Sequence, residues 1–325
     1  MFTDALTALL DDFCTPADVR RIESGGDAAP LWQAVTEAGF LDLMVPESAG
    51  GAGLPLAELY DIVALLGRHA VPVPLAASIA ARALIAPGTP LPAAPLALAT
   101  VLLRQPDGSL LLPRIPQAAA AHQVLVADGS RLLLLDGLAA QATPVGPPAG
   151  QEATWRLPEG AGVTQLPGDG TALPALALAV QSALIAGAAT RCMALTLDYA
   201  NQRVQFGKAL GKFQAVQQQL SRMAEHVAAT CMAAEAAFQP GPDGQAQWLQ
   251  AAIAKARCSE AAVLVADTAH ALHGAIGVTQ EYDLQLYTRR LRAWRVAHGS
   301  EAHWNQRIGE QVLAGSASVL DTIRG

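Results

Sequence analysis

The sequence predicts a mostly α-helical protein with a small β middle domain. Apolar residues recur at helical spacing over roughly the first quarter of the chain and again over its last half. Between these regions, short apolar runs alternate with prolines and Asp-Gly pairs, which is typical of strands joined by tight turns. We therefore expect an N-terminal helical domain at residues 1–86, a small β-barrel or sandwich at 87–168 and a C-terminal helical bundle at 169–325.

In the N-terminal region, Leu31, Val35 and Phe40 follow helical spacing with polar or small residues between them. Residues 45–53 contain a proline and several glycines and predict a loop. A helix pattern resumes at residues 54–66.

The middle region contains three short apolar runs, at residues 109–112, 123–126 and 131–135. The pairs Asp107-Gly108 and Asp128-Gly129 lie directly before or between these runs and favour tight turns. This pattern predicts a small sheet domain of short strands.

The C-terminal region returns to helical spacing at Leu173. An apolar stripe with steps of three and four comprises Phe213, Val216, Leu220, Met223, Val227 and Cys231. A further helix is expected from about Gln245 to His273, where Gly274 ends it. A last helix from Glu281 is expected to bury Leu284, Tyr287, Leu291 and Trp294, with Arg289, Arg290, Arg292 and Arg295 placed elsewhere around it. Four or five long helices predict a bundle.

The composition favours an oligomer and excludes some functions. At 325 residues, the chain is long enough for two or three packed units. Hydrophobic residues make up 52% of it and charged residues 15%, which favours extensive burial between domains or subunits. A net charge of −7 excludes the basic face that nucleic-acid binding requires.

Export and membrane insertion are not expected. Asp4, Asp11 and Asp12 precede any basic residue, whereas a secretory signal begins with basic residues. Residues 173–197 are apolar enough to suggest a membrane span, but Gln181 interrupts them, and we interpret the segment as a buried bundle helix. We therefore expect a cytoplasmic protein with no membrane partner.

The cysteines and histidines form no metal signature, so we assign no metal. The cysteines Cys14, Cys192, Cys231 and Cys258 are far apart and are expected to be reduced thiols. The chain also has no G-x-S-x-G or G-x-G-x-x-G motif, which argues against hydrolase and nicotinamide chemistry.

A loop at residues 206–212 joins two expected helices, with Arg203 at the end of one and Gln214 at the start of the next. A guanidinium, amide donors and a helix N-terminus gathered at one corner suit a phosphate. The alternative is a solvated surface loop. The loop is not a P-loop, because no Ser or Thr follows Lys212.

Three segments, in the right order, resemble the acyl-CoA dehydrogenase family. Residues 203–217 fit the pattern R-x-x-F-G-x-x-L-x-x-F-Q-x-x-Q without a gap. Residues 31–54 are similar to the family's E-x-G turn followed by V-P-E-x-x-G-G-x-G, and residues 271–281 are similar to Q-x-H-G-G-x-G-x-T-x-E. On these matches the chain is identified as a member of the family.

The resemblance implies a helical domain, a β-barrel and a four-helix bundle, with FAD as cofactor and tetramers built as dimers of dimers. It implies desaturation of an acyl-CoA substrate, in which a base takes the α-proton while a hydride passes to flavin N5. It also implies that Arg203, Gln205 and Phe206 contact the FAD of a neighbouring subunit, and that Gln214 reaches its flavin. Gly274 and Gly277 would allow close approach of the backbone to the cofactor.

The sequence departs from the family where the catalytic base is expected. Nine residues after Arg289, the family's glutamate is replaced by His298. The family's alternative position, seven residues before Gly187, holds Val180. Without a positioned base, proton removal typically slows by about a hundred- to ten-thousand-fold. His298, or Glu301 three residues later, remains a candidate base.

Two further departures concern the cofactor. Ala271 and Ala275 replace the Gln and the second Gly of the glycine-rich stretch. The middle domain is shortened and lacks the family's Thr-Glu-x-x-x-Gly-Ser-Asp run, so it offers no named flavin ligand.

Three hypotheses follow. In the first, the chain is the base-lacking partner subunit of a heterotetramer, similar to the α2β2 enzymes of steroid side-chain catabolism, and it completes a FAD site held mainly by a homologous subunit. In the second, it is a self-sufficient homodimer or homotetramer that uses His298 or Glu301. In the third, it is a scaffold without flavin. The family resemblance also implies a role in lipid metabolism and an electron-transfer flavoprotein as a candidate electron acceptor.

Overall fold

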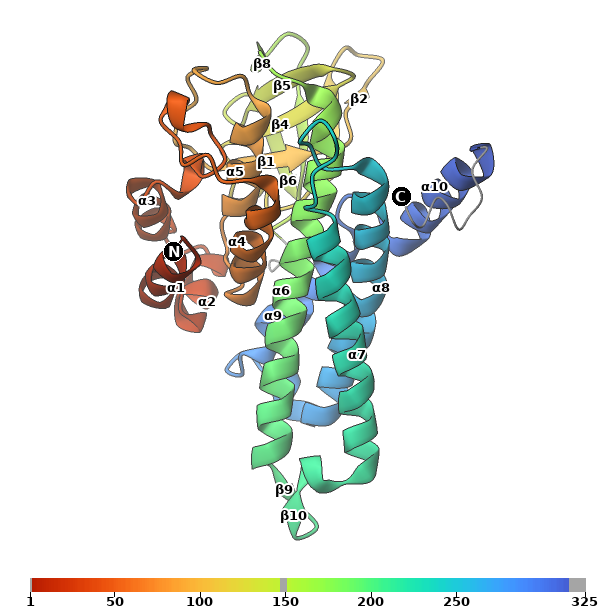
Figure 1. The fold of residues 1–325 in the computed structure, drawn as a ribbon. Helices are drawn as coiled ribbons and strands as arrows, with labels where there is room; N and C mark the ends of the chain where they lie inside the picture. The colour runs from red at the N-terminus through yellow and green to blue at the C-terminus, as the bar shows by residue number, and fades with distance from the viewer. Residues whose placement is uncertain (1, 147–150, 316–325) are drawn as a thin grey trace.

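The computed structural model describes residues 2–146 and 151–315 and confirms the predicted fold class. N-terminal helices, a small β region and a long helical bundle follow one another along the chain (Figure 1). The domain boundaries at 86 and 168 stay predictions, and the last part of the predicted bundle, residues 316–325, lies outside the described residues.

The N-terminal region is made of short helices. They are α1 (Phe2–Phe13), α2 (Pro16–Glu23), α3 (Ala29–Glu37), α4 (Leu56–Arg68) and α5 (Leu75–Leu84), with short 3-10 turns at Phe40–Asp42 and Glu47–Ala49. Leu31 and Val35 are buried on α3 as expected. Phe40 is not on that helix, because Gly39 adopts φ +77° and a separate turn begins after it.

Helices α4 and α6 (Leu173–Gln202) are in close contact because each carries a glycine at the contact. A Cβ at Gly187 would lie 1.8 Å from the carbonyl oxygen of Ala64, and a Cβ at Gly67 would lie 2.2 Å from that of Leu184. Only glycine permits this approach. The contact fixes the N-terminal helices against the bundle.

The β region forms two four-stranded sheets, of order β1-β4-β5-β8 and β2-β3-β7-β6. Their strands are β1 (Leu96–Ala99), β2 (Leu103–Arg104), β3 (Leu110–Ile115), β4 (Gln123–Asp128), β5 (Arg131–Asp136), β6 (Gln141–Pro144), β7 (Ala153–Leu157) and β8 (Val163–Leu166). The three predicted runs correspond to β3, β4 and β5. Strands β1 and β4 pair in parallel, so tight turns do not join all neighbouring strands.

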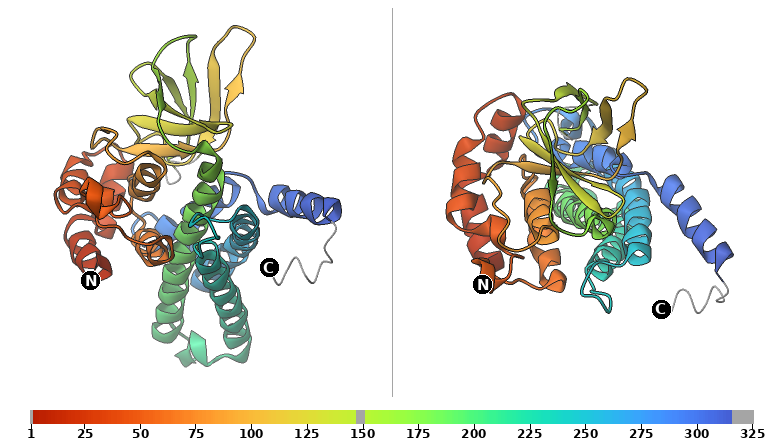
Figure 2. Two further views of the ribbon diagram at one scale, coloured as in Figure 1. Left: turned by 45° about the horizontal axis from the view of Figure 1, so that its top comes forward. Right: turned by 90° about the horizontal axis from the view of Figure 1, so that it is seen from above.

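Strands β1, β4 and β5 of the first sheet are mostly buried, whereas its edge strand β8 is mostly exposed. Leu132 and Leu134 of β5 pack into the main core with the helices, whereas Leu133 and Leu135 pack into the interior of the β region. This two-sided burial explains the continuous leucine run in the sequence. Figure 2 shows the sheets seated over the start of α6.

The bundle continues from α6 with α7 (Gln214–Ala236), α8 (Trp248–His273), α9 (Leu284–Val296) and α10 (Glu301–Ala314). Helix α6 has the length and hydropathy of a membrane span, but 89% of its most apolar window is buried inside the protein, as the sequence predicted for a bundle helix. The stretch Trp248–Val278 also meets the length and hydropathy test, and 39% of its window is buried.

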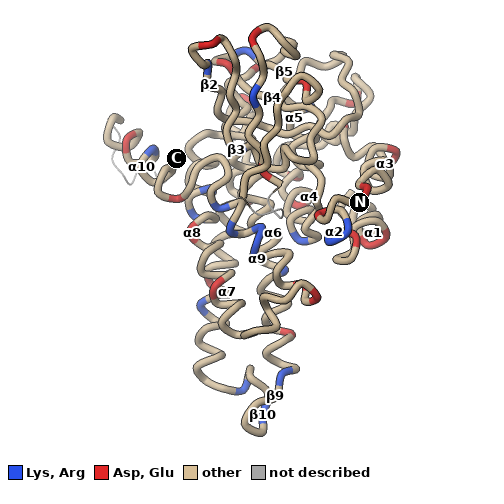
Figure 3. The backbone as a smooth tube through the Cα atoms, turned by 180° about the vertical axis from the view of Figure 1, so that it is seen from behind, with Lys and Arg blue, Asp and Glu red and all other residues tan. Residues whose placement is uncertain are grey.

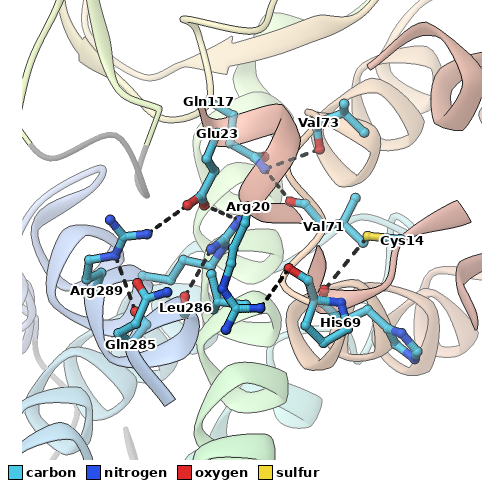
Figure 4. Close-up of polar contacts among 12 residues, drawn as sticks. Cys14, Arg20, Glu23, His69, Val71, Val73, Gln117, Gln285, Leu286 and Arg289 are labelled. Atoms are coloured by element: carbon cyan, nitrogen blue, oxygen red, sulfur yellow. Dashed lines mark hydrogen bonds and ion pairs between the residues drawn. The ribbon is translucent and has the colours of Figure 1, made fainter. Parts of the chain in front are cut away.

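Helices α2 and α9 are joined by two ion pairs of the buried Glu23 carboxylate, one of them to a buried arginine (Figure 4). The Glu23 carboxylate pairs with Arg289 at 2.8 Å and with Arg290 at 2.7 Å. Arg290 is 1% exposed, so the expectation that it lies outside the buried face of its helix is wrong. The Arg290 side chain is buried because it pairs with Glu23 of α2. The sequence pattern of α9 alone could not reveal this partner.

Candidate functional site

The predicted corner between α6 and α7 forms a small hairpin at the far end of the bundle (Figure 1). Strands β9 (Val204–Gln205) and β10 (Lys208–Ala209) pair antiparallel. The two turn residues, Phe206 and Gly207, have φ of +52° and +80°. A two-residue hairpin turn of this kind needs positive φ at both positions, which is unusual for a phenylalanine.

The side chains of the corner point to solvent. Phe206 is 92% exposed, and Arg203 and Gln214 are also exposed. Within the described residues, the side chains of Arg203, Gln205 and Gln214 have no hydrogen-bond or ion-pair partner. Residues 199–217 contain basic residues and no acidic one, and Figure 3 shows Lys and Arg gathered at this tip. A guanidinium and amides exposed together can bind an anion, and an exposed aromatic ring can stack on another flat ring.

Internal contacts brace the corner. The Arg203 carbonyl accepts a hydrogen bond of 2.8 Å from the Leu210 amide. The Phe206 and Phe213 rings meet edge to face at 6.3 Å, and Lys208 Nζ lies 4.3 Å from the centre of the Phe213 ring. These contacts connect the two sides of the loop within the chain.

Gly274 and Gly277 lie at the end of α8, next to the end of α6. Gly274 ends the helix with φ +65°. A Cβ at Gly277 would lie 2.9 Å from the His273 Cβ, so packing within the chain already requires this glycine. Tyr199 of α6 stacks on His273 with ring centres 4.4 Å apart. The two glycines therefore belong to the same half of the bundle as the corner, and their approach to a cofactor stays a prediction.

A second centre lies at the other end of α6, where the β region meets the bundle. A cavity of about 300 Å³ is lined there by residues of the β region, of α6 and of the segment after α9. Its walls include Thr100, Arg114, Leu178, His298 and Trp304. The residue that replaces the expected base therefore faces a cavity of small-molecule size.

His298 is held in this cavity as a neutral imidazole. Its Nδ1 lies 3.0 Å from the Thr100 hydroxyl oxygen. Burial, together with the ammonium of Lys255, lowers the pKa of His298 to about 3. An imidazole with this pKa is unprotonated at neutral pH, but it is a weak proton acceptor.

The other base positions offer no better acceptor. Both carboxylate oxygens of Glu301 bind Arg295, which lowers the pKa of this carboxyl group, and Glu301 is not among the residues that line the cavity. Val180 is buried on α6.

The structure adds Glu152, a buried carboxylate near this centre that the sequence reasoning missed. It is 3% exposed and pairs at 2.9 Å with the cavity residue Arg114. Burial raises the pKa of Glu152. An isolated glutamate at the start of a strand gives no sequence signal of such a position.

The corner and the cavity are far apart. Leu178 lines the cavity near the start of α6, whereas Arg203 follows the end of the same helix. The roughly 25 residues between them correspond to about 37 Å at about 1.5 Å per helical residue. The corner and the cavity therefore lie at opposite ends of α6.

Among residues 2–146 and 151–315, no group of three His, Cys, Asp or Glu side chains could hold a metal ion. The four cysteines are free thiols.

The chain matches known proteins over nearly its whole length. The family models "Acyl-CoA dehydrogenase, N-terminal domain" and "Acyl-CoA dehydrogenase, C-terminal domain" match residues 1–90 and 169–313. The acyl-CoA dehydrogenase IpdE2 of Mycolicibacterium smegmatis is 32% identical over 311 residues, which cover 92% of each chain. IpdE2 of Mycobacterium tuberculosis is also 32% identical, over 92% of this chain and 91% of its own.

Solved structures share the fold. A chain of the ChsE4-ChsE5 complex from Mycobacterium tuberculosis superposes with a TM-score of 0.83 at 20% identity, with 97% of both chains covered. A chain of the steroid ACAD Tcur3481-Tcur3483 gives 0.79 at 25% identity, with 96% of both chains covered. Butyryl-CoA dehydrogenase from Megasphaera elsdenii gives 0.75 at 19% identity, over 96% of this chain and 98% of that chain.

Proposed function

This chain belongs to the acyl-CoA dehydrogenase family, and from that membership we propose that it is the partner subunit of a heteromeric, FAD-dependent acyl-CoA dehydrogenase. In this proposal a homologous subunit holds most of the FAD and supplies the catalytic base. The chain described here completes the cofactor site with its α6–α7 corner, and the complex desaturates an acyl-CoA thioester between its α and β carbons.

The separation of the two centres along α6 carries this proposal. Among the described residues, no hydrogen-bond or ion-pair partner meets the side chains of Arg203, Gln205 and Gln214, and these side chains lie at the opposite end of α6 from the chain's own cavity. A cofactor that binds the corner must therefore extend into another subunit. A homodimer would meet this condition too, so the location of the base has to distinguish the two assemblies.

The base positions favour a heteromer. His298 is a weak acceptor because its pKa is lowered, and Glu301 is held by Arg295. A second subunit that provides a carboxylate would supply the missing proton acceptor, while the cavity around His298 would have no part in proton removal.

The residues of the corner fit FAD by their chemistry. The guanidinium of Arg203 would bind the diphosphate, the amides of Gln205 and Gln214 would hydrogen-bond to polar edges of the cofactor, and the exposed Phe206 ring would cover the adenine. FAD supplies the hydride acceptor for the reaction. The chain's own contribution is to bind and orient the cofactor.

The relatives support an assembly of this kind. IpdE2 is named an acyl-CoA dehydrogenase, and the two neighbours of highest TM-score given above are a complex of ChsE4 with ChsE5 and a steroid ACAD of two named components. We extend the proposal to a steroid or other lipid acyl-CoA as substrate, to an electron-transfer flavoprotein as electron acceptor and to the cytoplasm as location.

The proposal is tested by purifying a tagged form of this chain from its host and, separately, by producing it alone. We expect a second acyl-CoA dehydrogenase subunit to co-purify, the complex to show the visible flavin absorbance, and the chain alone to bind little FAD. A chain that alone forms a yellow tetramer and oxidises acyl-CoA as fast as the complex would contradict the proposal. A colourless complex would instead support the hypothesis that the chain is a scaffold without flavin.

A self-sufficient enzyme is the second candidate, and one observation favours it. The imidazole of His298 lines a cavity of about 300 Å³, where an acyl chain could be accommodated. Substitution of His298 separates the two candidates, because only the self-sufficient enzyme would need this imidazole for activity.

A further inference from the structure

Lys255 is a buried lysine on α8 that has no carboxylate partner within ion-pair distance in the described chain. The residue is 0% exposed. Its ammonium donates hydrogen bonds of 2.7 Å to the Ser259 hydroxyl, 2.8 Å to the Arg295 carbonyl and 2.8 Å to the Gly299 carbonyl. All three N–H donors are therefore used. A charge buried in this way is costly, so its contacts have to be strong or functionally required.

The two carbonyls that Lys255 binds belong to residues before and after His298 in the sequence. One belongs to the last turn of α9, and the other follows His298 directly. The segment between them adopts an unusual backbone, since His298 has φ +55° and Gly299 has φ +104°. A non-glycine residue at positive φ costs free energy and persists only where surrounding contacts hold it.

A second contact comes from the other side of the same turn. The indole Nε1 of Trp304 donates a hydrogen bond of 3.0 Å to the His298 carbonyl. Three carbonyls of the turn are thus held in place. Lys255 binds those of Arg295, at the end of α9, and Gly299, and Trp304 binds that of His298. The imidazole is then presented to Thr100 in the wall of the cavity.

We propose that Lys255 is a positioning residue, which fixes the turn at 295–299 so that the His298 imidazole stays hydrogen-bonded to Thr100 in the wall of the cavity. It acts through the backbone and touches neither substrate nor cofactor. This role of Lys255 does not depend on which subunit supplies the base, because Lys255, His298 and Thr100 all belong to the free chain.

The charges around Lys255 agree with this role. Burial lowers the pKa of Lys255 to about 7, while Glu301 and Glu152 act in the opposite direction and Arg295 in the same direction. Neither carboxylate lies within ion-pair distance of the ammonium, so the backbone carbonyls and Ser259 remain its direct partners.

The test uses Lys255→Met, which keeps most of the side-chain volume and removes the donors, with Ser259→Ala as the matched control. Side-chain NMR of the histidines in the free chain reports the pKa and hydrogen bonding of His298. In Lys255→Met we expect the NMR signature of the hydrogen bond between His298 and Thr100 to be lost. We also expect the pKa of His298 to rise by about one unit, because a nearby cation is removed. Ser259→Ala removes the hydrogen bond of 3.0 Å from Ser259 Oγ to the Arg295 carbonyl but leaves both carbonyl contacts of Lys255, so it should retain both properties.

A second variant separates positioning from packing. Lys255→Ala should lose the same His298 signature and regain it when a small alkylammonium ion is added, whereas an uncharged alcohol of similar size should not restore it. An unchanged His298 spectrum in a folded Lys255→Met protein would overturn the proposal, as would equal rescue by the alcohol. The failure of the proposed heteromer would appear instead in the purification experiment and would leave these spectra unaffected.

Discussion

The imidazole of His298 and the hydroxyl of Thr100 lie 3.0 Å apart and join the helical bundle to the β region across the cavity wall. The two residues are 198 positions apart in the sequence. Their contact places a neutral, weakly basic group where the family's glutamate is expected. The chain therefore retains a cavity at the expected position of the base but has lost the carboxylate.

The first prediction concerns the activity of the complex. His298→Ala is expected to change the rate of acyl-CoA oxidation by less than about threefold, because the base lies in the partner; loss of a true general base would cost about a hundred- to ten-thousand-fold. His303→Ala, which removes another imidazole from the same cavity, is the comparison. A loss of two or more orders of magnitude in His298→Ala alone would support the self-sufficient enzyme.

The second prediction concerns acid stability. The folded pKa of His298, about 3, is lower than the ordinary value of 6.5. As the pH falls through the unfolded pKa, the unfolded chain takes up a proton at this residue and the native chain does not, so native stability decreases from about pH 6.5 towards about pH 3. His298→Asn removes this contribution. Urea unfolding at about pH 7 and about pH 5 should show that the variant loses less unfolding free energy at the lower pH than the wild type does. Equal losses in the two proteins would show that the pKa of His298 is not lowered in the folded chain.

The third prediction concerns the joint between α2 and α9. Glu23→Ala leaves the buried Arg290 without its partner and is expected to lower the free energy of unfolding by about 3–5 kcal/mol. Glu260→Ala removes an ion pair from a side chain that is 65% exposed and should cost less than about 1 kcal/mol. Chemical denaturation measures both, and similar small effects would show that the buried pair contributes little.

The fourth prediction concerns the contact between α4 and α6. Gly187→Ala would place a Cβ 1.8 Å from the Ala64 carbonyl oxygen, so the helices must separate, at a cost of about 1–3 kcal/mol or more. Gly309→Ala on the exposed α10 meets nothing within 4 Å and should stabilise the protein by about 0.5–1 kcal/mol. If Gly187→Ala is neutral in thermal unfolding, the close approach of the two helices is not required.

Local patterns in the sequence predicted the elements that are fixed by nearby residues. The corner at 203–214 is contiguous in the chain, so the motif contains all its side chains. Strands β3 to β5 were recognisable from leucine-rich and valine-rich runs next to Asp-Gly pairs. Strands such as β6 and β8 were missed because they are four residues long and mostly exposed, so they carry little hydrophobic signal.

Contacts between distant segments could not be predicted. Glu23 and Arg289 are 266 residues apart, and Lys255 and Gly299 are 44 apart. No periodic pattern in the sequence links such residues. Each forms an ion pair or a hydrogen bond with a group that comes close only when the chain folds. The cavity at His298 is built in the same way, from the β region and two parts of the bundle.

The affinity of the complex for FAD after Arg203→Ala tests the cross-subunit site most directly, with Lys212→Ala as a matched removal of a cation from the same corner. Arg203→Ala should weaken FAD binding by about tenfold or more, because charge-assisted hydrogen bonds are lost, whereas Lys212→Ala should change the affinity by less than about threefold. Leu178→Trp, which fills the chain's own cavity, should leave FAD binding intact. Retention of FAD by Arg203→Ala, together with its release by Leu178→Trp, would contradict the account and place the cofactor in this chain's own cavity.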